Sequence, residues 1–319
     1  MAESAEAPAP ELRPLGVGEI LDVSIKIYTR HFRTLLAIVA LVVVPVELLL
    51  VPLLASAIPD PELLRPQFRL TPEPLDVSDR ELGRFLTGAG ISGLFSLVAT
   101  LLAQAAAFQA VREAYLGRRP GWRRSVGFML RRLHSVLWVS ALPFLLLLLA
   151  LLAGAVVIGV LAALGGGGGA AIAVVSLGIA ALFTALVWLG LTWAFAVPAL
   201  MVEGLRGRRA LGRSFRLVRG RWWPTAAAVA LGFLLAFVVQ VIAASLLQAL
   251  LFTDIGDSAL GAVVVSQLGS ALGAALATPF QAAIVAVVYF DLRVRREGFD
   301  LELLAGGVAD GSSQPERSE

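Results

Sequence analysis

The carboxylic acid in the most unusual chemical setting is Glu47, which lies inside the apolar run VVVPVELLL. It comes about thirteen residues into a segment that is long enough to cross a membrane, roughly 20 Å deep and past the bilayer centre. A charge at that depth costs about 2.5–3.5 kcal/mol, so we expect Glu47 to be protonated, hydrogen-bonded or facing a cavity. The other polar candidates inside apolar runs are Gln240, at a comparable depth, and Gln104, at a shallower one.

Two roles for Glu47 follow from this setting. A neutral glutamic acid can hold helices together through hydrogen bonds, whereas an acid in a transport pathway carries protons or cations. The apolar segments contain few other polar residues from which a pathway could be built. The structural role is therefore the first hypothesis, and transport is the alternative.

Enzyme chemistry has little support in this sequence. The chain has no cysteine, which excludes a thiolate zinc site and a cysteine nucleophile, and its two histidines are His31 and His134. No nucleophile elbow, HExxH or phosphate-binding loop pattern is present. We therefore expect no catalytic activity, no cofactor and no metal.

Arginine is concentrated in short segments, above all GWRRSVGFMLRRLH at 121–134 and ALGRSFRLVRGRWW at 210–223. Placed on a helix, each segment has one apolar face, and several arginines lie away from it. Such helices lie in the headgroup layer with their arginines toward anionic lipid, although an ordinary positive loop would also explain the charge. A nucleic-acid site is not expected. The candidate lipid-interface residues are Trp122, Arg123, Arg124, Arg131, Arg213, Arg216, Arg219 and Trp222.

The elements that position these residues are membrane spans. Of the 319 residues, 58% are hydrophobic and 15% charged, whereas soluble domains average about 25% charged. Six segments have the length that a spanning helix needs. They cover residues 34–58, 88–111, 136–164, 170–202, 223–252 and 261–290.

The distribution of basic residues predicts the orientation. Twenty-two of the 26 lysines and arginines fall on the side that carries both termini, and four fall in the segment 58–87 on the other side. Cytoplasmic loops carry the positive excess, so both termini are predicted to be cytoplasmic. The expected location is a bacterial cytoplasmic membrane.

Three similar units are visible along the chain. The segment ILDVSIKIYTRHF at 20–32 has the apolar spacing of the two arginine segments, and Ser24, Ser125 and Ser214 fall at matching places. An acid followed by paired arginines ends every second span: Glu113, Glu203 and Asp291. These matches predict a threefold internal repeat of about residues 15–119, 120–209 and 210–305.

The segments LGVGEILDVSIKIYTRHFRTLL, ALGRSFRLVRGRWW and YFDLRVRREGFDLELLA resemble those of the glycerophosphoryl diester phosphodiesterase membrane domain family, multi-span proteins common in actinobacteria. The resemblance extends from about Leu15 to Ala305. In that family a soluble phosphodiesterase domain can follow the membrane domain, but only fourteen polar residues follow Ala305 here. The resemblance therefore implies a six-span membrane domain without the hydrolase.

Together these features predict an all-α integral membrane protein. Six transmembrane helices form three hairpin repeats, each preceded by a cytoplasmic amphipathic interfacial helix, within residues 15–305. Residues 1–14 and 306–319 are expected to be disordered tails. We expect a non-catalytic scaffold or accessory subunit that contacts anionic lipid headgroups and binds another membrane protein. The alternative is a transporter or channel for a small solute that uses Glu47.

Overall fold

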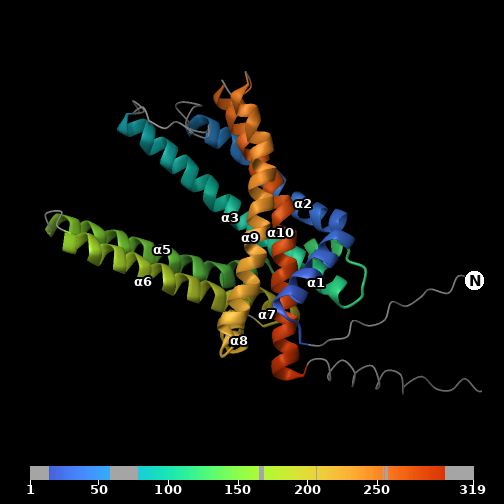
Figure 1. Ribbon diagram of the computed structural model, residues 1–319. Helices are drawn as coiled ribbons and strands as arrows, with labels where there is room; N and C mark the ends of the chain where they lie inside the picture. Colours follow the sequence, from blue (N-terminus) through green and yellow to red (C-terminus); the bar gives the residue numbers. More distant parts are fainter. Residues whose placement is uncertain are drawn as a thin grey trace, which may run out of the picture. The chain divides into compact units, whose positions relative to one another are not determined.

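The chain is helical throughout the part that the structure describes. The computed structural model describes residues 14–57, 78–164, 169–205, 207–253, 255 and 258–298, and it has no strand among them (Figure 1). The predicted disordered tails, the glycine run at 165–169 and most of the segment 58–87 fall largely outside these residues.

Long helices alternate with shorter ones along the described chain. Short helices precede α2, α5 and α9, and the 3₁₀ helix η2 (Ala249–Phe252) follows α9. The α-helices are α1 (Val17–Arg30), α2 (Phe32–Ala57), α3 (Asp79–Tyr115), α4 (Trp122–Arg131), α5 (Leu133–Leu164), α6 (Gly169–Trp193), α7 (Ala196–Glu203), α8 (Arg208–Val218), α9 (Trp222–Gln248) and α10 (Ala259–Glu297).

Within the described residues, five helical segments are long and apolar enough to cross a membrane. They are Phe32–Ala57, Asp79–Tyr115, Ser176–Glu203, Trp222–Leu251 and Ala259–Glu297. The remaining predicted span, 136–164, coincides with the 32-residue helix α5, in which several side chains lie outside the description. The helical class and the membrane character of the protein are therefore confirmed.

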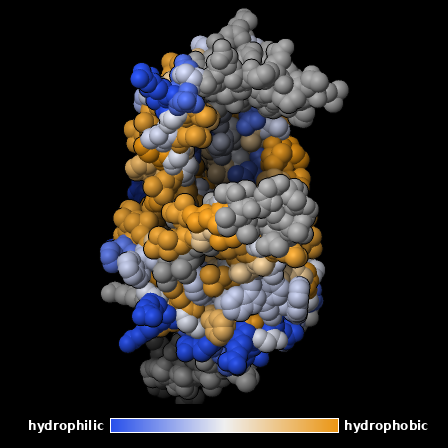
Figure 2. Space-filling view, turned by 90° about the vertical axis from the view of Figure 1, so that its left-hand side faces the viewer, coloured by the Kyte–Doolittle hydropathy of each residue, from blue (hydrophilic) through white to orange (hydrophobic). Residues whose placement is uncertain are grey.

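The surface agrees with a membrane environment. Large apolar side chains are exposed along the long helices, including Leu49 at 77%, Leu246 at 70% and Phe183 at 67%. Hydrophobic residues cover much of the visible face, and hydrophilic residues gather in separate patches (Figure 2). Lipid chains, unlike water, impose no penalty on this exposure.

Packing divides the chain into two compact units. Unit 1 takes its residues from Met1–Arg131 and Ala227–Asp291, and unit 2 from Arg132–Ala226 and Leu292–Glu319. Unit 1 contains α1 to α4 and most of α9 and α10, and unit 2 contains α5 to α8 with the two helix ends nearest to them. In unit 2, α5 and α6 pack side by side (Figure 1). The two units are defined by contacts between helices, whereas the three repeats are a prediction from sequence similarity along the chain.

Helix α3 begins nine residues before the predicted span 88–111. Ser78 and Glu81 form a capping box, in which the Ser78 hydroxyl accepts from the Glu81 N–H and the Glu81 carboxylate accepts from the Ser78 N–H. These bonds satisfy backbone donors at the helix start. Residues 79–87, predicted to belong to an outer loop, are therefore helical.

The predicted span 170–202 is two helices. Helix α6 ends at Trp193, and α7 begins at Ala196 after a short turn. Pro198 explains the break, because its ring clashes with the carbonyl four residues earlier, at Ala194, and it has no N–H to donate there. By contrast, α2 continues through Pro45 and Pro52, and α10 through Pro279.

Small residues let α10 pack closely in unit 1. A Cβ at Gly273 would lie 3.0 Å from the Gln240 carbonyl on α9, and one at Gly269 would lie 3.3 Å from the Ala244 carbonyl. From the other side of this contact, a Cβ at Gly232 would lie 2.2 Å from the Ile284 Cδ1. The GxxxG spacing of α10 thus serves packing against α9.

The three short helices bury their serines. Ser24 in α1, Ser125 in α4 and Ser214 in α8 are each 0% exposed. The apolar faces are partly buried and partly exposed: Met129 is 2% and Val218 1% exposed, whereas Ile25 is 44%, Phe215 38% and Trp122 43% exposed. Small serines permit close packing, and part of each apolar face remains on the surface.

Each serine also marks the start of the next long helix. Helices α2, α5 and α9 begin at Phe32, Leu133 and Trp222, eight residues after Ser24, Ser125 and Ser214 respectively. At each junction the carbonyl before the new helix accepts the first α-helical bond: His31 from Leu35, Arg132 from Val136 and Arg221 from Thr225. The three positions therefore share this spacing and this backbone bond, although one residue joins α1 to α2 and α4 to α5, whereas Arg219, Gly220 and Arg221 join α8 to α9.

Candidate functional site

Glu47 lies inside unit 1 and is 4% exposed. The Gln267 amide on α10 donates a hydrogen bond of 2.8 Å to its carboxylate, and the Ser96 side chain on α3 is a second hydrogen-bond partner. Three helices therefore contribute to one polar cluster in the middle of the apolar helices. Polar groups buried in this way hold helices together and fix their register.

The other intramembrane candidates do not share this cluster. Gln240, on α9, lies at the contact with Gly273, and Gln104 is half-buried on α3. The partner of Glu47 that the sequence interpretation missed is Gln267. It is apparent only once α2 and α10 pack together, because 220 residues separate the two side chains.

A second polar cluster lies in unit 2 around Arg213 of α8. Its guanidinium donates to both carboxylate oxygens of Glu203, at 2.9 and 2.8 Å, and to both of Glu297. Arg293 also contacts Glu297, at 3.3 Å. The Arg213 side chain is 16% exposed, so these bonds are largely shielded from water.

Electrostatics favour the charged form of this arginine. The hydrogen bonds to Glu297 and then to Glu203 raise the pKa of the Arg213 guanidinium above its ordinary value, although burial acts in the opposite direction. Arg213 is therefore a fixed cation between two carboxylates. It had been predicted to face lipid, and it turns inward because Glu203 and Glu297 converge on it.

The acid at the end of α3 makes a looser contact of the same type. Glu113 is 6% exposed, accepts a 3.4 Å bond from the Gln109 amide, and lies 3.9 Å from the Arg124 guanidinium of α4. The Arg124 side chain is 70% exposed. This pair is consequently open to water and to salt.

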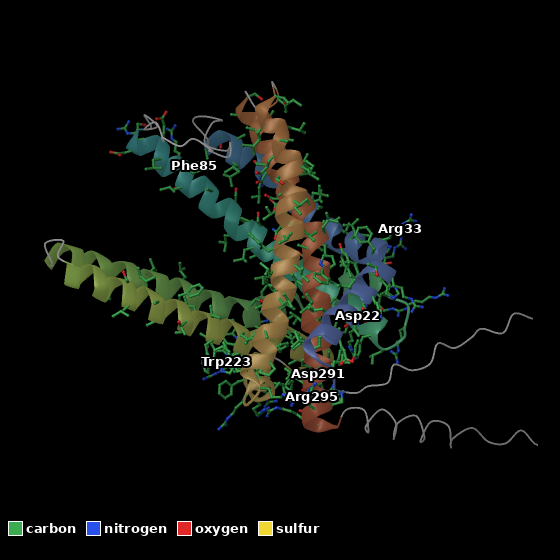
Figure 3. All side chains as sticks on the ribbon, viewed as in Figure 1. Asp22, Arg33, Phe85, Trp223, Asp291 and Arg295 are labelled. Carbon is green, nitrogen blue, oxygen red and sulfur yellow. The ribbon has the colours of Figure 1, made fainter. Side chains whose placement is uncertain are left out.

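The third acid of the signature, Asp291, ends its span in unit 1 and is 7% exposed. Its carboxylate accepts a 2.7 Å bond from the Leu15 N–H, just before α1. Asp291 is labelled in Figure 3. About two turns before the end of α10, the Phe290 ring stacks on Tyr115 of α3 with the ring centres 4.7 Å apart. Each signature acid therefore contacts the segment that holds a short helix: α4, α8 or α1.

The remaining lipid-interface candidates lie on the surface. The exposed residues of this group are Trp122, Arg123, Arg124, Arg131, Arg216 and Arg219. The Arg123 guanidinium lies 5.0 Å from the centre of the Trp122 ring, and Trp222 is half-buried. Exposed arginine beside exposed tryptophan is the composition of a headgroup-level surface.

In the described ranges no group of three or more histidines, cysteines or acids lies close enough together to hold a metal ion.

Comparison with known proteins gives one match. The model of a family described as a domain of unknown function, DUF8558, matches residues 6–294. No curated protein and no solved structure matches the chain. The matched segment includes all three short helices, Glu47 and the three signature acids.

Proposed function

The chain belongs to the DUF8558 family, a domain of unknown function, and from that premise we propose that it is a non-catalytic integral membrane scaffold or accessory subunit. Its short helices α1, α4 and α8 lie in the cytoplasmic headgroup layer of a bacterial cytoplasmic membrane. The exposed arginines and tryptophan of α4 contact anionic lipid and leave a cytoplasmic surface for a partner membrane protein. The observation that carries this proposal is that each of these helices has a buried side, an exposed apolar side and a charged side.

Each short helix divides its surface in the same way. The serine side is buried, an apolar side chain next to it is exposed, and charged residues occupy the rest. In α4 the exposed apolar residues are Trp122 at 43% and Leu130 at 56%, beside Arg123, Arg124 and Arg131. A helix in the headgroup layer needs an apolar side for the acyl boundary and a cationic side for phosphate, worth about 1 kcal/mol for each basic residue.

We further propose six spans arranged as three repeats, with both termini in the cytoplasm. The common spacing from serine to the next helix supports this arrangement, as does the contact of each signature acid with a short-helix segment. Helix α5 supplies the sixth span. The bias of 22 basic residues to one side supports the orientation.

We also propose that the chain is related to the glycerophosphoryl diester phosphodiesterase membrane domain family. The quoted segments support it, and the described helical fold agrees with a membrane domain. A scaffold of that kind would recruit an enzyme rather than catalyse. The partner is then expected to be a membrane protein, not a nucleic acid.

Photo-crosslinking tests the scaffold role. A photoreactive amino acid at Arg131 of α4 should capture one protein repeatedly in native membranes, because that position is exposed beside the arginine surface. The matched control is Leu246, which is 70% exposed on α9 and should capture lipid. If position 131 captures only lipid or a random set of proteins, the scaffold role is wrong.

The Glu47 cluster favours a second candidate function, transport of a small solute or proton. A buried acid with two hydrogen-bond partners from two other helices is a common feature of ion pathways. Reconstituted vesicles test it: transport predicts a pH-dependent flux that Glu47→Gln abolishes. Wild-type vesicles without flux for protons, common cations or small solutes would reject this alternative.

A further inference from the structure

A pocket of about 650 Å³ opens between the last turns of α2 and the first turns of α3, both in unit 1. Its wall includes Leu53 and Ala57 of α2 and Arg80, Arg84, Thr87 and Ile91 of α3. Gly88 also lines the pocket, and a Cβ there would come within 2.4 Å of the Ala57 Cβ. The two helices therefore touch at Gly88, beside the pocket.

A stripe of small and polar residues leads from the pocket to Glu47. Gly88, Ser92 and Ser96 are four residues apart, so they lie on one face of α3. The stripe covers about 12 Å along the helix, and it ends at Ser96, a partner of Glu47. Helix α3 thus presents one continuous line from the pocket edge to the buried acid.

Ser92 is the unusual member of this line. It is 5% exposed, and its hydroxyl has no hydrogen-bond partner among the residues that the structure describes. A buried hydroxyl without a partner is costly, and such groups are typical of places that receive water or a ligand. Ser92 is one helical turn from Ser96, so this hydroxyl lies on α3 between the pocket-lining Gly88 and the Glu47 partner Ser96.

From these observations we infer that Glu47 is a proton-exchange site reached from the pocket side of the membrane through Ser92 and Ser96. The inference relies on the topology proposed above for its assignment to the outer side, and it is independent of the scaffold role. A hydroxyl both donates and accepts, so two serines and intervening water form a chain for protons. Protonation at Glu47 would break or weaken the Gln267 bond and couple outer pH to the packing of α2 against α10.

The chemistry of the path favours a proton over a metal cation. Arg80 and Arg84 at the pocket are exposed and would repel a cation before it entered. The Gln267 group that faces Glu47 is an N–H donor, which cannot coordinate a cation. The negative charge of the Glu47 carboxylate is thus balanced by hydrogen-bond donors or removed by a proton.

Other titratable groups are too far away to act on Glu47 directly. Helix α1 packs near Leu276, whose carbonyl accepts from Tyr28 and lies about 14 Å along α10 from Gln267. Helix α4 places Arg124 against Glu113, about 25 Å along α3 from Ser96. The titratable or charged side chains on the packed helices include Arg33 on α2, Arg84, Arg112 and Glu113 on α3, Lys26, Tyr28 and Arg30 on α1, Arg123, Arg124 and Arg131 on α4, and Tyr289 and Asp291 on α10.

Apolar side chains from α2, α3 and α10 pack together in unit 1. Val51, Leu54 and Val263 form a buried apolar cluster, with Phe85 and Ala89 packed against it. In the proposed path this cluster is the barrier, and water reaches Glu47 when it loosens. Leu54→Ala should speed proton exchange, because it removes apolar volume from the barrier without changing a polar group.

The first experiment labels Glu47 with dicyclohexylcarbodiimide, a hydrophobic reagent that modifies protonated carboxyls. The full-length protein is reconstituted in oriented vesicles, and modification of the Glu47 peptide is followed by mass spectrometry. We expect labelling to fall as pH rises on the pocket side and to ignore pH on the other side. Ser92→Ala should slow the response to a pH jump several-fold, Leu54→Ala should speed it, and the lipid-exposed control Ser270→Ala should leave it unchanged.

The second experiment uses the absence of native cysteine. An impermeant thiol reagent added from the pocket side should modify Thr87→Cys rapidly and Ser92→Cys more slowly, and should leave the exposed α10 control Ser270→Cys unmodified. Addition of Leu54→Ala should raise the Ser92→Cys rate. These readouts need no knowledge of a transported solute.

The outcomes separate the possible errors. Protection of Glu47 by sodium at constant pH would identify a cation site and overturn the proton assignment. Labelling that follows pH on the opposite side, or no labelling at any pH, would overturn the path. Modification of Thr87→Cys only from the cytoplasmic side would reject the proposed topology, while Ser92→Cys reacting from that same side would keep the path and reverse its direction.

Discussion

Two arginines at the same place in the sequence pattern make very different contacts. Arg124 in α4 and Arg213 in α8 each directly precede a fully buried serine, and each contacts the acid that ends the preceding apolar helix. Arg124 is 70% exposed and 3.9 Å from Glu113, whereas Arg213 is 16% exposed and binds two carboxylates. The pattern brings acid and arginine together, but the second acid, Glu297, converts a loose pair into a buried cluster.

The largest effect is expected at Arg213. Arg213→Gln leaves two partly buried carboxylates without their cation and should lower the free energy of unfolding by about 3 kcal/mol. Thermal unfolding of the purified protein in detergent measures the loss. Arg216→Gln, on the exposed side of the same helix, is the control and should change stability by less than about 0.5 kcal/mol. Equal effects of the two substitutions would mean that the Arg213 cluster is not a stabilising centre.

An intermediate effect is expected at Glu47, where the cluster contains no cation. Glu47→Leu removes the partners of Gln267 and Ser96 and should cost about 1–2 kcal/mol, because each such bond in a membrane contributes about 1 kcal/mol or less. Glu47→Gln keeps donor and acceptor groups and should retain the fold and the expression level. A larger loss for Gln than for Leu would contradict this order.

The buried serines offer a smaller and more selective comparison. The Ser214 hydroxyl donates to the Thr192 carbonyl, and no partner for the Ser125 hydroxyl is found in the described residues. Ser214→Ala should therefore cost about 1 kcal/mol, whereas Ser125→Ala should be neutral or slightly stabilising. Unfolding midpoints of the two variants, measured side by side, decide the point. A larger loss of stability for Ser125→Ala than for Ser214→Ala would contradict the roles that their hydrogen bonds indicate.

The smallest effect is expected at Arg124. Arg124→Gln removes an exposed contact and should lower stability by about 0.5 kcal/mol or less, and added salt should erase the difference. The salt series on wild type and variant is the measurement. A loss above about 2 kcal/mol would show that Arg124 and Arg213 are equivalent after all.

Periodicity and charge were sufficient to predict the helical membrane class. Apolar runs of spanning length and arginine-rich segments between them depend on local composition, which the sequence displays directly. The start of α3 was also encoded locally, in the Ser78–Glu81 capping box, but hydropathy alone obscured it because four of the residues 79–87 are charged. The break before Pro198 was hidden in the same way inside an apolar run.

The candidate sites were less predictable because they depend on contacts between distant residues. Glu47 stood out by its own burial, yet Gln267 was invisible until α10 packed beside α2. Arg213 was assigned to lipid because helical spacing cannot show that Glu203 and Glu297 converge on it. The full burial of Ser24, Ser125 and Ser214 likewise depends on packing between helices, which the spacing of apolar residues along one helix does not display.

The depth of the short helices tests the central claim most directly. Single cysteines introduced at an exposed apolar and an exposed charged position of each helix, Ile25 and Lys26 in α1, Leu130 and Arg131 in α4, and Phe215 and Arg216 in α8, carry spin labels in lipid vesicles. Accessibility to oxygen and to a water-soluble nickel chelate reports depth. Headgroup-layer helices predict that the apolar position of every pair is deeper than the charged one and near the phosphate level. Labels that are all in bulk water, or all in the acyl core, would contradict the account.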